Sequence, residues 1–521
     1  MCDSTIRLFK SHHIQLMKIN TSRPFFTQLI LGAASMFAAN VSAEVKLPNI
    51  IGNDMVLQRD MPVPIWGWAD KGEEVTVSFA GQSKTTKANE NGKWMVKLSA
   101  LKAKEAPAKM TIEGNNKITL ENILVGEVWI CSGQSNMEWS IRASMNAKEE
   151  IAASKHPVIR LFNVPGHKVH PKPQERLAIP TEWKVCNPDT SSNFSAVGYY
   201  FGRRLLKELD VPVGLIGSNW GGTRIEPWTT LDGFESVAEL SKEAEKVKSY
   251  KADTKVGGGS PSAIYNQMVH PLAPFAMRGA IWYQGESNGG EHMSYYHKKH
   301  ALVNGWRKIF QNDELGFYWV QLANFRKPNV RVVQDPKKEF SNPAGGDGWA
   351  KIREAQTKAL DIRHTGMAVA IDLADAHNPN DIHPRNKQDV GGRLAQWALH
   401  QTYGKKELVP TGPLYKGHKI KGGKVQLSFD HVGKGLMVGK KTKLEPTAEV
   451  KGGKLEHFSI AGEDKKWVWA DAAIDGDTVV VSSKEVKKPV AVRYGFTMNP
   501  ANANLYNKDG IPALPFRTDD W

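Results

Sequence analysis

The chain has 521 residues, of which 40% are hydrophobic, and carries a formal net charge of +15. This length allows a large core and exceeds that of one ordinary domain, so we expect about two or three domains and exclude a disordered chain. The lysines are scattered through the chain and form no long basic block. This pattern favours a solvated surface over a nucleic-acid-binding one, and we expect no nucleic-acid partner.

Residues 1–43 differ in kind from the rest. Basic residues precede an apolar run from Phe25 to Ala39, which ends at the small residues of Val41-Ser42-Ala43. A basic segment, a short apolar segment and a small-residue end are typical of a secretory signal peptide, and the run is too short and interrupted to indicate a membrane span. The sequence predicts a signal peptide over 1–43 and a mature chain without a membrane span, secreted across the inner membrane to the periplasm.

Residues 44–120 alternate between apolar and polar positions in short runs. Two examples are Glu74-Val-Thr-Val-Ser78 and Lys93-Trp-Met-Val-Lys-Leu98, and Asn91-Gly92 lies before the second as a turn. Period-two alternation with such turns predicts a small antiparallel β domain.

From 121 to 411 the pattern changes to apolar strands followed by longer helical segments. The strand Val213–Gly217 follows a helix predicted over Ser195–Leu209, and the strand Gly279–Tyr283 precedes one near Met293–Phe310. Alternating strands and helices predict a parallel sheet covered on both faces. Short alternating runs return over 412–521, so we expect a second β region there.

Two cysteines lie beyond the leader, Cys131 and Cys186. They would pair only in an oxidising compartment, whereas the apolar strand around Cys131 equally suits a buried free thiol. The sequence leaves both alternatives open. The spacing of Cys and His residues matches no zinc site.

Polar clusters follow three of the predicted parallel strands. They contain Gly133-Gln-Ser135-Asn, the glycine pair Gly221-Gly222, and Gln284. Ligands of parallel sheets bind at the carboxyl ends of strands, so we expect these clusters to meet. A serine at a strand end is a candidate nucleophile, although the same residue types also form ordinary turns. The backbone N–H groups of Ser135 and Gly222 and the Gln284 amide are candidate donors to the oxyanion of an acyl-transfer intermediate.

A candidate base follows the strand that ends at Ile371. His383 precedes a proline at the head of an amphipathic helix, and Asp381 is close enough in sequence to orient its imidazole. The same segment permits a metal site formed by His377, His383, Asp372 and Asp375. The metal site is the weaker hypothesis, because the segment lacks the i, i+4 histidine pair of a helical zinc site. We therefore predict no metal and no cofactor.

Four segments together resemble a known family. GQSNMEW, SNWGGTRIEPW, IWYQGESN and DIHPRNK, in this order, are similar to the four blocks of the sialate O-acetylesterase group of SGNH hydrolases. The resemblance covers nearly all of the chain after residue 43. It implies a flavodoxin-like three-layer α/β hydrolase domain over 121–411, with Ser135 as nucleophile, His383 as base, and Ser135, Gly222 and Gln284 as oxyanion donors.

One position departs from the family pattern. Many SGNH enzymes carry an aspartate three residues before the histidine, where this chain has Asn380, and its aspartate is Asp381. Asp381 therefore completes a triad of altered geometry, or a backbone carbonyl supports a Ser-His dyad, and the sequence does not separate the two.

The resemblance implies a secreted esterase that removes acetyl groups from sialic acids or related sugars. An acetylesterase acting on xylan or another plant polysaccharide is the first alternative, and a non-catalytic carbohydrate-binding protein is the second. Side chains near the strand ends are candidate contacts for a sugar ring, although core packing is as good an explanation for each tryptophan. These candidates are Trp139, Trp220, Trp228, Trp282 and Arg224.

Overall fold

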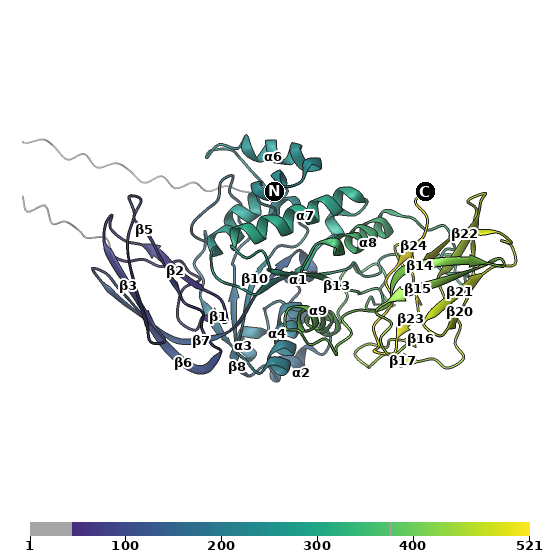
Figure 1. Cartoon of the computed structure of the whole chain (residues 1–521), viewed down its shortest axis with the longest axis horizontal. Coiled ribbons are helices and arrows are strands. Elements are labelled where there is room, and N and C mark those ends of the chain that lie inside the picture. The colour runs from purple at the N-terminus through teal and green to yellow at the C-terminus, as the bar shows by residue number, and fades with distance from the viewer. Residues whose placement is uncertain (1–43, 376) are drawn as a thin grey trace, which may run out of the picture. The chain divides into compact units, whose positions relative to one another are not determined.

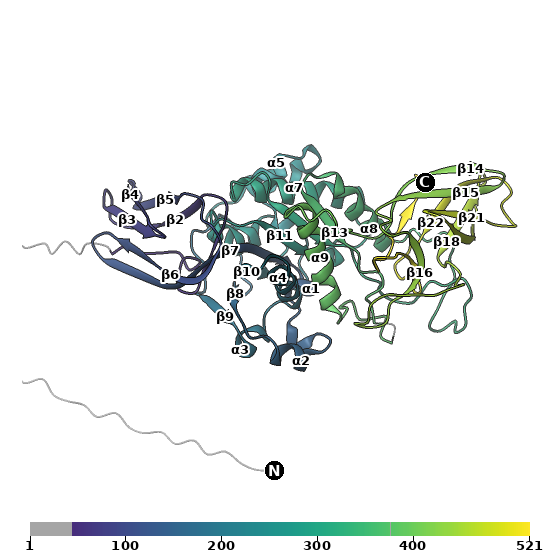
Figure 2. The ribbon, with the colours of Figure 1, turned by 60° about the horizontal axis from the view of Figure 1, so that its bottom comes forward.

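The computed structural model describes residues 44–375 and 377–521, and the predicted signal peptide lies outside these residues. The N-terminal region is built mainly from antiparallel pairs, as the alternation predicts: β2 pairs with β5, and β3 pairs with β4 and β6 (Figures 1 and 2). Strand β1 instead pairs in parallel with the strand Lys117–Gly133. In β5 the side chains of Trp94, Val96 and Leu98 are buried and those between them are exposed. The strands are β1 (Val56–Gln58), β2 (Val63–Trp68), β3 (Glu74–Phe79), β4 (Gln82–Lys87), β5 (Lys93–Leu98) and β6 (Lys104–Glu113).

Strand β7 (Lys117–Gly133) connects this region to the central sheet. Its first part pairs antiparallel with β6, and its second part pairs in parallel with neighbours in the central sheet. The boundary expected at residue 120 therefore falls inside one continuous strand.

The central sheet confirms the predicted α/β class. Its order is β13-β12-β11-β7-β10-β8-β9, in which every neighbouring pair is parallel except β8 with β9. Five of these strands, β10-β7-β11-β12-β13, follow the doubly wound order 2-1-3-4-5, and β8 and β9 extend the edge beside β10. Besides β7, the strands of the central sheet are β8 (His156–Asn163), β9 (Trp183–Cys186), β10 (Val213–Asn219), β11 (Gly279–Tyr283), β12 (Gly316–Val320) and β13 (Thr365–Ala368).

Helices cover both faces of this sheet (Figure 2). Side chains of β7 alternate between the faces, so that Trp129 and Cys131 pack with α4 (Ala196–Leu209) and α9 (Lys387–Gln401). Val128 and Ile130 belong to the core on the opposite face, which includes α7 (Met293–Ile309) and α8 (Gly348–Lys358). The shorter helices are α1 (Ser135–Glu138), α2 (Ala147–Ala152), α3 (Pro188–Ser191), α5 (Leu231–Glu235) and α6 (Ser241–Lys248).

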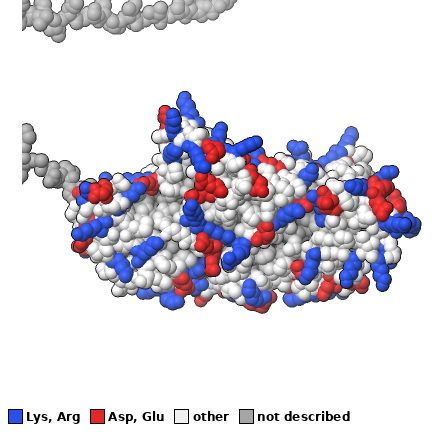
Figure 3. All heavy atoms as spheres, turned by 45° about the horizontal axis from the view of Figure 1, so that its top comes forward, with Lys and Arg blue, Asp and Glu red and all other residues white. Residues whose placement is uncertain are grey.

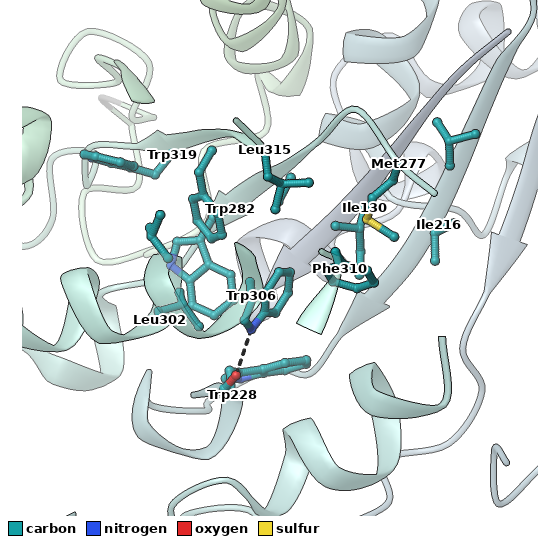
Figure 4. Packing of buried hydrophobic residues seen from close by; sticks show 14 of the residues in the cluster. Ile130, Ile216, Trp228, Met277, Trp282, Leu302, Trp306, Phe310, Leu315 and Trp319 are labelled. Atoms are coloured by element: carbon teal, nitrogen blue, oxygen red, sulfur yellow. Dashed lines mark hydrogen bonds between the residues drawn. The ribbon is translucent and has the colours of Figure 1, made fainter. Parts of the chain in front are cut away.

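The core beneath α7 is rich in tryptophan (Figure 4). Trp282 of β11 packs edge-on against Trp228 and Trp306, with ring centroids 6.0 and 6.1 Å apart. The indole N–H of Trp306 donates to the carbonyl of Trp228 at 3.0 Å, which satisfies a polar group that burial would otherwise leave unpaired. This packing fixes the strand from which one of the predicted polar clusters continues.

The C-terminal part confirms the second β region. Between Leu414 and Arg517 the described chain forms three antiparallel sheets, ordered β14-β15-β21-β20, β17-β16-β23 and β19-β18-β22-β24. The strands are β14 (Leu414–Lys421), β15 (Lys424–Asp430), β16 (Leu436–Lys440), β17 (Ala448–Glu449), β18 (Phe458–Gly462), β19 (Trp467–Trp469), β20 (Asp471–Asp475), β21 (Thr478–Ser482), β22 (Pro489–Tyr494), β23 (Leu505–Asn507) and β24 (Phe516–Arg517).

Cys131 and Cys186 are buried free thiols. Burial raises the pKa of both, that of Cys186 to about 12, so neither is a reactive thiolate at neutral pH. On the face drawn in Figure 3, basic and acidic side chains are interspersed. Among residues 44–375 and 377–521, the helices are too short or too polar to cross a membrane.

Candidate active site

The nucleophile candidate begins a helix directly after the central strand. Strand β7 ends at Gly133, and α1 starts at Ser135. Gly133 has φ +135°, and a Cβ at this position would lie 2.1 Å from the carbonyl oxygen of Tyr283 in β11, so the turn requires glycine. The N–H of Gln134 donates to the same carbonyl at 2.9 Å. The neighbouring strand therefore holds the turn that presents Ser135.

Ser135, His383 and Asp381 form a continuous chain of contacts. His383 Nε2 lies 2.9 Å from Ser135 Oγ, and His383 Nδ1 lies 3.2 Å from Asp381 Oδ1. The backbone N–H of His383 also donates to Asp381 Oδ1, at 2.9 Å. Trp139 stacks on the imidazole with ring centroids 4.8 Å apart and an interplanar angle of 19°. The aspartate two residues before the histidine thus contacts the ring, for which the sequence left Asp381 and a backbone carbonyl as alternative partners.

The surroundings of His383 favour its neutral form. Burial lowers its pKa most, the positive charge of Lys387 lowers it further, and the contact with Asp381 opposes both. An ionised carboxylate only accepts hydrogen bonds, so the ring proton belongs on Nδ1 and Nε2 is free to accept from the serine hydroxyl. This is the protonation state that a general base requires.

A buried polar group behind the serine was not predicted from the sequence. The side-chain amide of Asn136 donates to Glu286 Oε1 at 2.6 Å and to the carbonyl of Ile382 at 3.0 Å, and Lys387 donates to its oxygen. Lys387 is fully buried, which lowers its pKa to about 7, and burial raises the pKa of Glu286. Asn136, Glu286 and Lys387 all lie within the four family blocks, and this position was the sequence signal that could have identified them.

The glycine pair lies beside the serine, as expected. A Cβ on Gly221 would be 3.3 Å from the Cβ of Ser135, and the N–H of Gly221 donates to Glu138 Oε2 at 2.6 Å. Gly222 has φ +74°, and a Cβ there would meet no atom within 4 Å. The Gly222 backbone therefore borders open space, and its neighbour Gly221 lies beside the candidate nucleophile, which suits a donor to a ligand.

Gln284 does not reach this open space, which corrects its expected role as an oxyanion donor. Its side chain is fully buried, and its amide nitrogen donates to Asn288 Oδ1 at 2.7 Å, Thr223 O at 3.2 Å and Gln134 Oε1 at 3.3 Å. These protein acceptors already satisfy both N–H groups. Gln284 instead links the loops that follow β7, β10 and β11.

Two of the predicted sugar contacts are also wrong. Trp228 and Trp282 are fully buried in the core of Figure 4, where no substrate can touch them. Trp139 and Trp220 are partly exposed, and Trp220 stacks on His167 with ring centroids 4.8 Å apart. Arg224 is partly exposed and pairs with Glu226 and Glu291. These three side chains stay candidates.

The alternative metal site is not assembled. Arg393 binds both carboxylate oxygens of Asp372, at 2.6 and 2.8 Å, while His383 faces Ser135. Within residues 44–375 and 377–521, no three His, Cys, Asp or Glu side chains are grouped to hold a metal ion.

Comparison with known proteins places the chain among the carbohydrate esterases. Residues 125–400 match the family described as carbohydrate esterase, sialic acid-specific acetylesterase. Sialate O-acetylesterase from Homo sapiens is 30% identical over 514 residues, covering 90% of this chain and 92% of that protein. The Mus musculus enzyme is 29% identical and covers 94% of this chain and 97% of its own length.

A solved structure extends the comparison to the fold. A carbohydrate acetylesterase from Xanthomonas citri superimposes with a TM-score of 0.79 at 38% sequence identity, covering 92% of this chain and 100% of that one. Fold and sequence thus define this protein as an esterase of carbohydrates. The chain belongs to the family of sialic acid-specific acetylesterases, which confirms the resemblance seen in the four blocks.

Proposed function

We propose that this esterase removes O-acetyl groups from sialic acids or related sugars through an acyl-enzyme on Ser135. The observation that carries the proposal is the Ser135–His383–Asp381 chain of contacts at the carboxyl end of the central strand. Its relatives named sialate O-acetylesterase support the substrate class.

The reaction has two halves. Ser135 Oγ attacks the acetyl carbonyl carbon while His383 Nε2 takes the hydroxyl proton, and the carbonyl oxygen becomes an oxyanion. The bond from carbon to the sugar oxygen then breaks, and His383 gives its proton to that oxygen. In the second half His383 deprotonates a water that attacks the acetyl group on Ser135, and acetate leaves as the serine is reprotonated. The Nδ1 proton stays on the His383 ring throughout and donates a hydrogen bond to Asp381.

The backbone N–H groups of Ser135 and Gly222 are the proposed oxyanion donors. Ser135 is the first residue of α1, where an N–H has no partner within the helix, and the Gly222 backbone borders open space. Losing one such donor raises a barrier by about 3–4 kcal/mol, so the exclusion of Gln284 leaves a site that relies strongly on these two.

We further propose that residues 121–411 form the flavodoxin-like three-layer domain of SGNH hydrolases. The order 2-1-3-4-5 of five central strands and the helices on both faces support this. Ser135 follows the first strand of that order, next to the crevice where the order reverses. We also propose that residues 1–43 direct export to the periplasm.

Acetate release from three substrates tests the proposal. Purified protein is given O-acetylated sialic acid, acetylated xylan and 4-nitrophenyl acetate at equal acetyl concentrations, with Ser135→Ala as the matched control. We expect all activity to depend on Ser135 and kcat/KM to be about tenfold or more higher for the sialic acid than for xylan, a difference of about 1.4 kcal/mol. A preference for xylan would assign the alternative substrate, and activity that survives in Ser135→Ala would overturn the mechanism.

A further inference from the structure

A buried cluster ties the serine turn to the histidine loop. It consists of Asn136, Glu286, Lys387 and the backbone carbonyl of Ile382, and we name it the Asn136 clamp. Asn136 directly follows the serine in sequence, and Ile382 directly precedes the histidine. The bond of 3.0 Å from the Asn136 amide to the Ile382 carbonyl therefore joins the immediate neighbours of the two reacting residues.

The partners of Asn136 fix which way its amide points. The protonated Lys387 amine has only donors, so it must face the Asn136 oxygen. The two amide protons then go to Glu286 Oε1 and the Ile382 carbonyl, both of which only accept once the carboxylate is ionised. A reversed amide would set its NH₂ group against the lysine and its oxygen against two acceptors. With Asn136 buried from water, each lost bond would cost about 1–3 kcal/mol.

We propose that Lys387 and Asn136 are positioning residues for acyl transfer, which hold His383 Nε2 within hydrogen-bond reach of Ser135 Oγ through the Ile382 carbonyl. Lys387 acts through Asn136, since its side chain reaches neither the serine nor open solvent. The inference rests on the proposed serine mechanism. It adds that Asn136 and Lys387 together keep His383 Nε2 close to Ser135 Oγ, which neither side chain does alone.

The clamp also places a charge near the base. The groups that face Lys387 are the carboxylates of Glu286 and Asp381, the His383 imidazole, and the rings of Trp139 and Tyr283 at 5.6 and 5.2 Å from its amine. A protonated Lys387 disfavours a second positive charge on His383, while Asp381 favours it. The Lys387 amine gains its proton as the pH falls. Its positive charge then lowers the pKa of His383, so the imidazole stays unprotonated to a lower pH than it would without the lysine charge.

Lys387→Met tests the proposal, because methionine has a similar length and no N–H groups. With 4-nitrophenyl acetate we expect kcat to fall about 10- to 100-fold, the size expected for misplacing a reacting group, with KM within about threefold. The acid limb of the kcat/KM profile should move to higher pH, which loss of packing alone would not produce. Lys299→Met is the matched control, since Lys299 is equally buried and packs with the core on the opposite face of the sheet; it should keep the wild-type kcat and acid limb.

Asn136→Ala separates the two effects and decides the matter if Lys387→Met does not fold. It removes the clamp and leaves the lysine charge, so kcat should fall about 10- to 100-fold while the acid limb stays in place. Wild-type kcat in Asn136→Ala, or in a folded Lys387→Met whose acid limb has not moved, would overturn the inference. Ser135→Ala is assayed alongside. An active Ser135→Ala enzyme defeats the serine mechanism, whereas an inactive one beside a fully active Asn136→Ala enzyme defeats only the clamp.

Discussion

Replacing Asp381 with asparagine tests how the imidazole is held. Asp381 Oδ1 accepts from two donors, the His383 backbone N–H at 2.9 Å and Nδ1 at 3.2 Å. Asparagine keeps an oxygen at this position, and the backbone N–H fixes its orientation, because a reversed amide would set NH₂ against that N–H. We therefore expect the variant to preserve the tautomer with a proton on Nδ1 and to lose only the negative charge.

The size of the effect follows from this geometry. A hydrogen bond to a charged group contributes about 1.5–3 kcal/mol and a neutral one about 0.5–1.5 kcal/mol, so the imidazolium formed in the reaction loses about 1–2 kcal/mol. At about 1.4 kcal/mol per factor of ten, kcat should fall about 5- to 30-fold. Both side chains are partly exposed, 25% for His383 and 32% for Asp381, so solvent further limits the effect of the charge. Neutralising a triad aspartate that alone selects the tautomer costs far more, about 10⁴-fold.

Hydrolysis of 4-nitrophenyl acetate between pH 5 and 9 measures this effect, with His383→Ala as the variant that lacks the base. Since Asp381 raises the pKa of His383, its neutralisation should move the acid limb of kcat/KM to lower pH, opposite to the shift expected for Lys387→Met. A loss near 10⁴-fold would show that the amide reverses and the tautomer is lost. A near-wild-type Asp381→Asn enzyme with an unmoved acid limb, beside an inactive His383→Ala enzyme, would show that Asp381 is only a turn residue.

Three further predictions concern other parts of the chain. Ser135→Ala should lower kcat by on the order of 10⁶-fold without changing the melting temperature, and more than a tenth of the wild-type kcat would exclude Ser135 as nucleophile. In the described chain Lys299 Nζ is buried without a hydrogen-bond partner, so Lys299→Met should raise the free energy of unfolding by about 1–2 kcal/mol at pH 6. Burial lowers the pKa of Lys299, so the wild type gains stability as pH rises toward about 10.4 and the advantage of the variant should shrink; thermal unfolding at pH 6 and 9 measures both. Expressed in a Gram-negative host, the mature protein should begin at Glu44 in the periplasmic fraction, and N-terminal sequencing that finds Met1 or Met17 on the active protein would contradict this.

The periodicity of apolar residues predicted individual helices and strands of the α/β domain. The helix expected over Ser195–Leu209 is observed as Ala196–Leu209, and the strand Gly279–Tyr283 has the expected bounds. The junction at residue 120 was not predictable in this way, because β7 continues unbroken while only its pairing partners change. Which strands pair in the C-terminal sheets was equally hidden, since β15 pairs with β21 across a long separation in sequence.

For the candidate site, the sequence predicted which residues lie near strand ends, but not which way their side chains point. The clusters at the ends of β7 and β10 meet because parallel strands bring their carboxyl ends to one edge of the sheet. Trp282 lies two residues before Gln284 and shares that edge, yet its side chain points into the core with Trp306. Successive side chains of a strand point to opposite faces, so nearness to a strand end does not decide exposure. Sequence position alone therefore placed two buried tryptophans among the substrate contacts.

The proposed positioning contacts join parts of the chain that lie far apart in the sequence. Ser135 and His383 are separated by 248 positions, and their contact of 2.9 Å depends on two loops that follow different strands. A histidine loop without a helix or strand of its own has few backbone bonds to fix it, so side chains must supply them. Asn136 does so from beside the serine and Asp381 from beside the histidine. Because Asn136 bonds the carbonyl next to His383 and Asp381 bonds His383 itself, a small displacement of either side chain would move the proposed base directly. Loss of kcat in a variant that is still fully folded at the assay temperature is therefore the result that distinguishes such residues from those that only stabilise the fold.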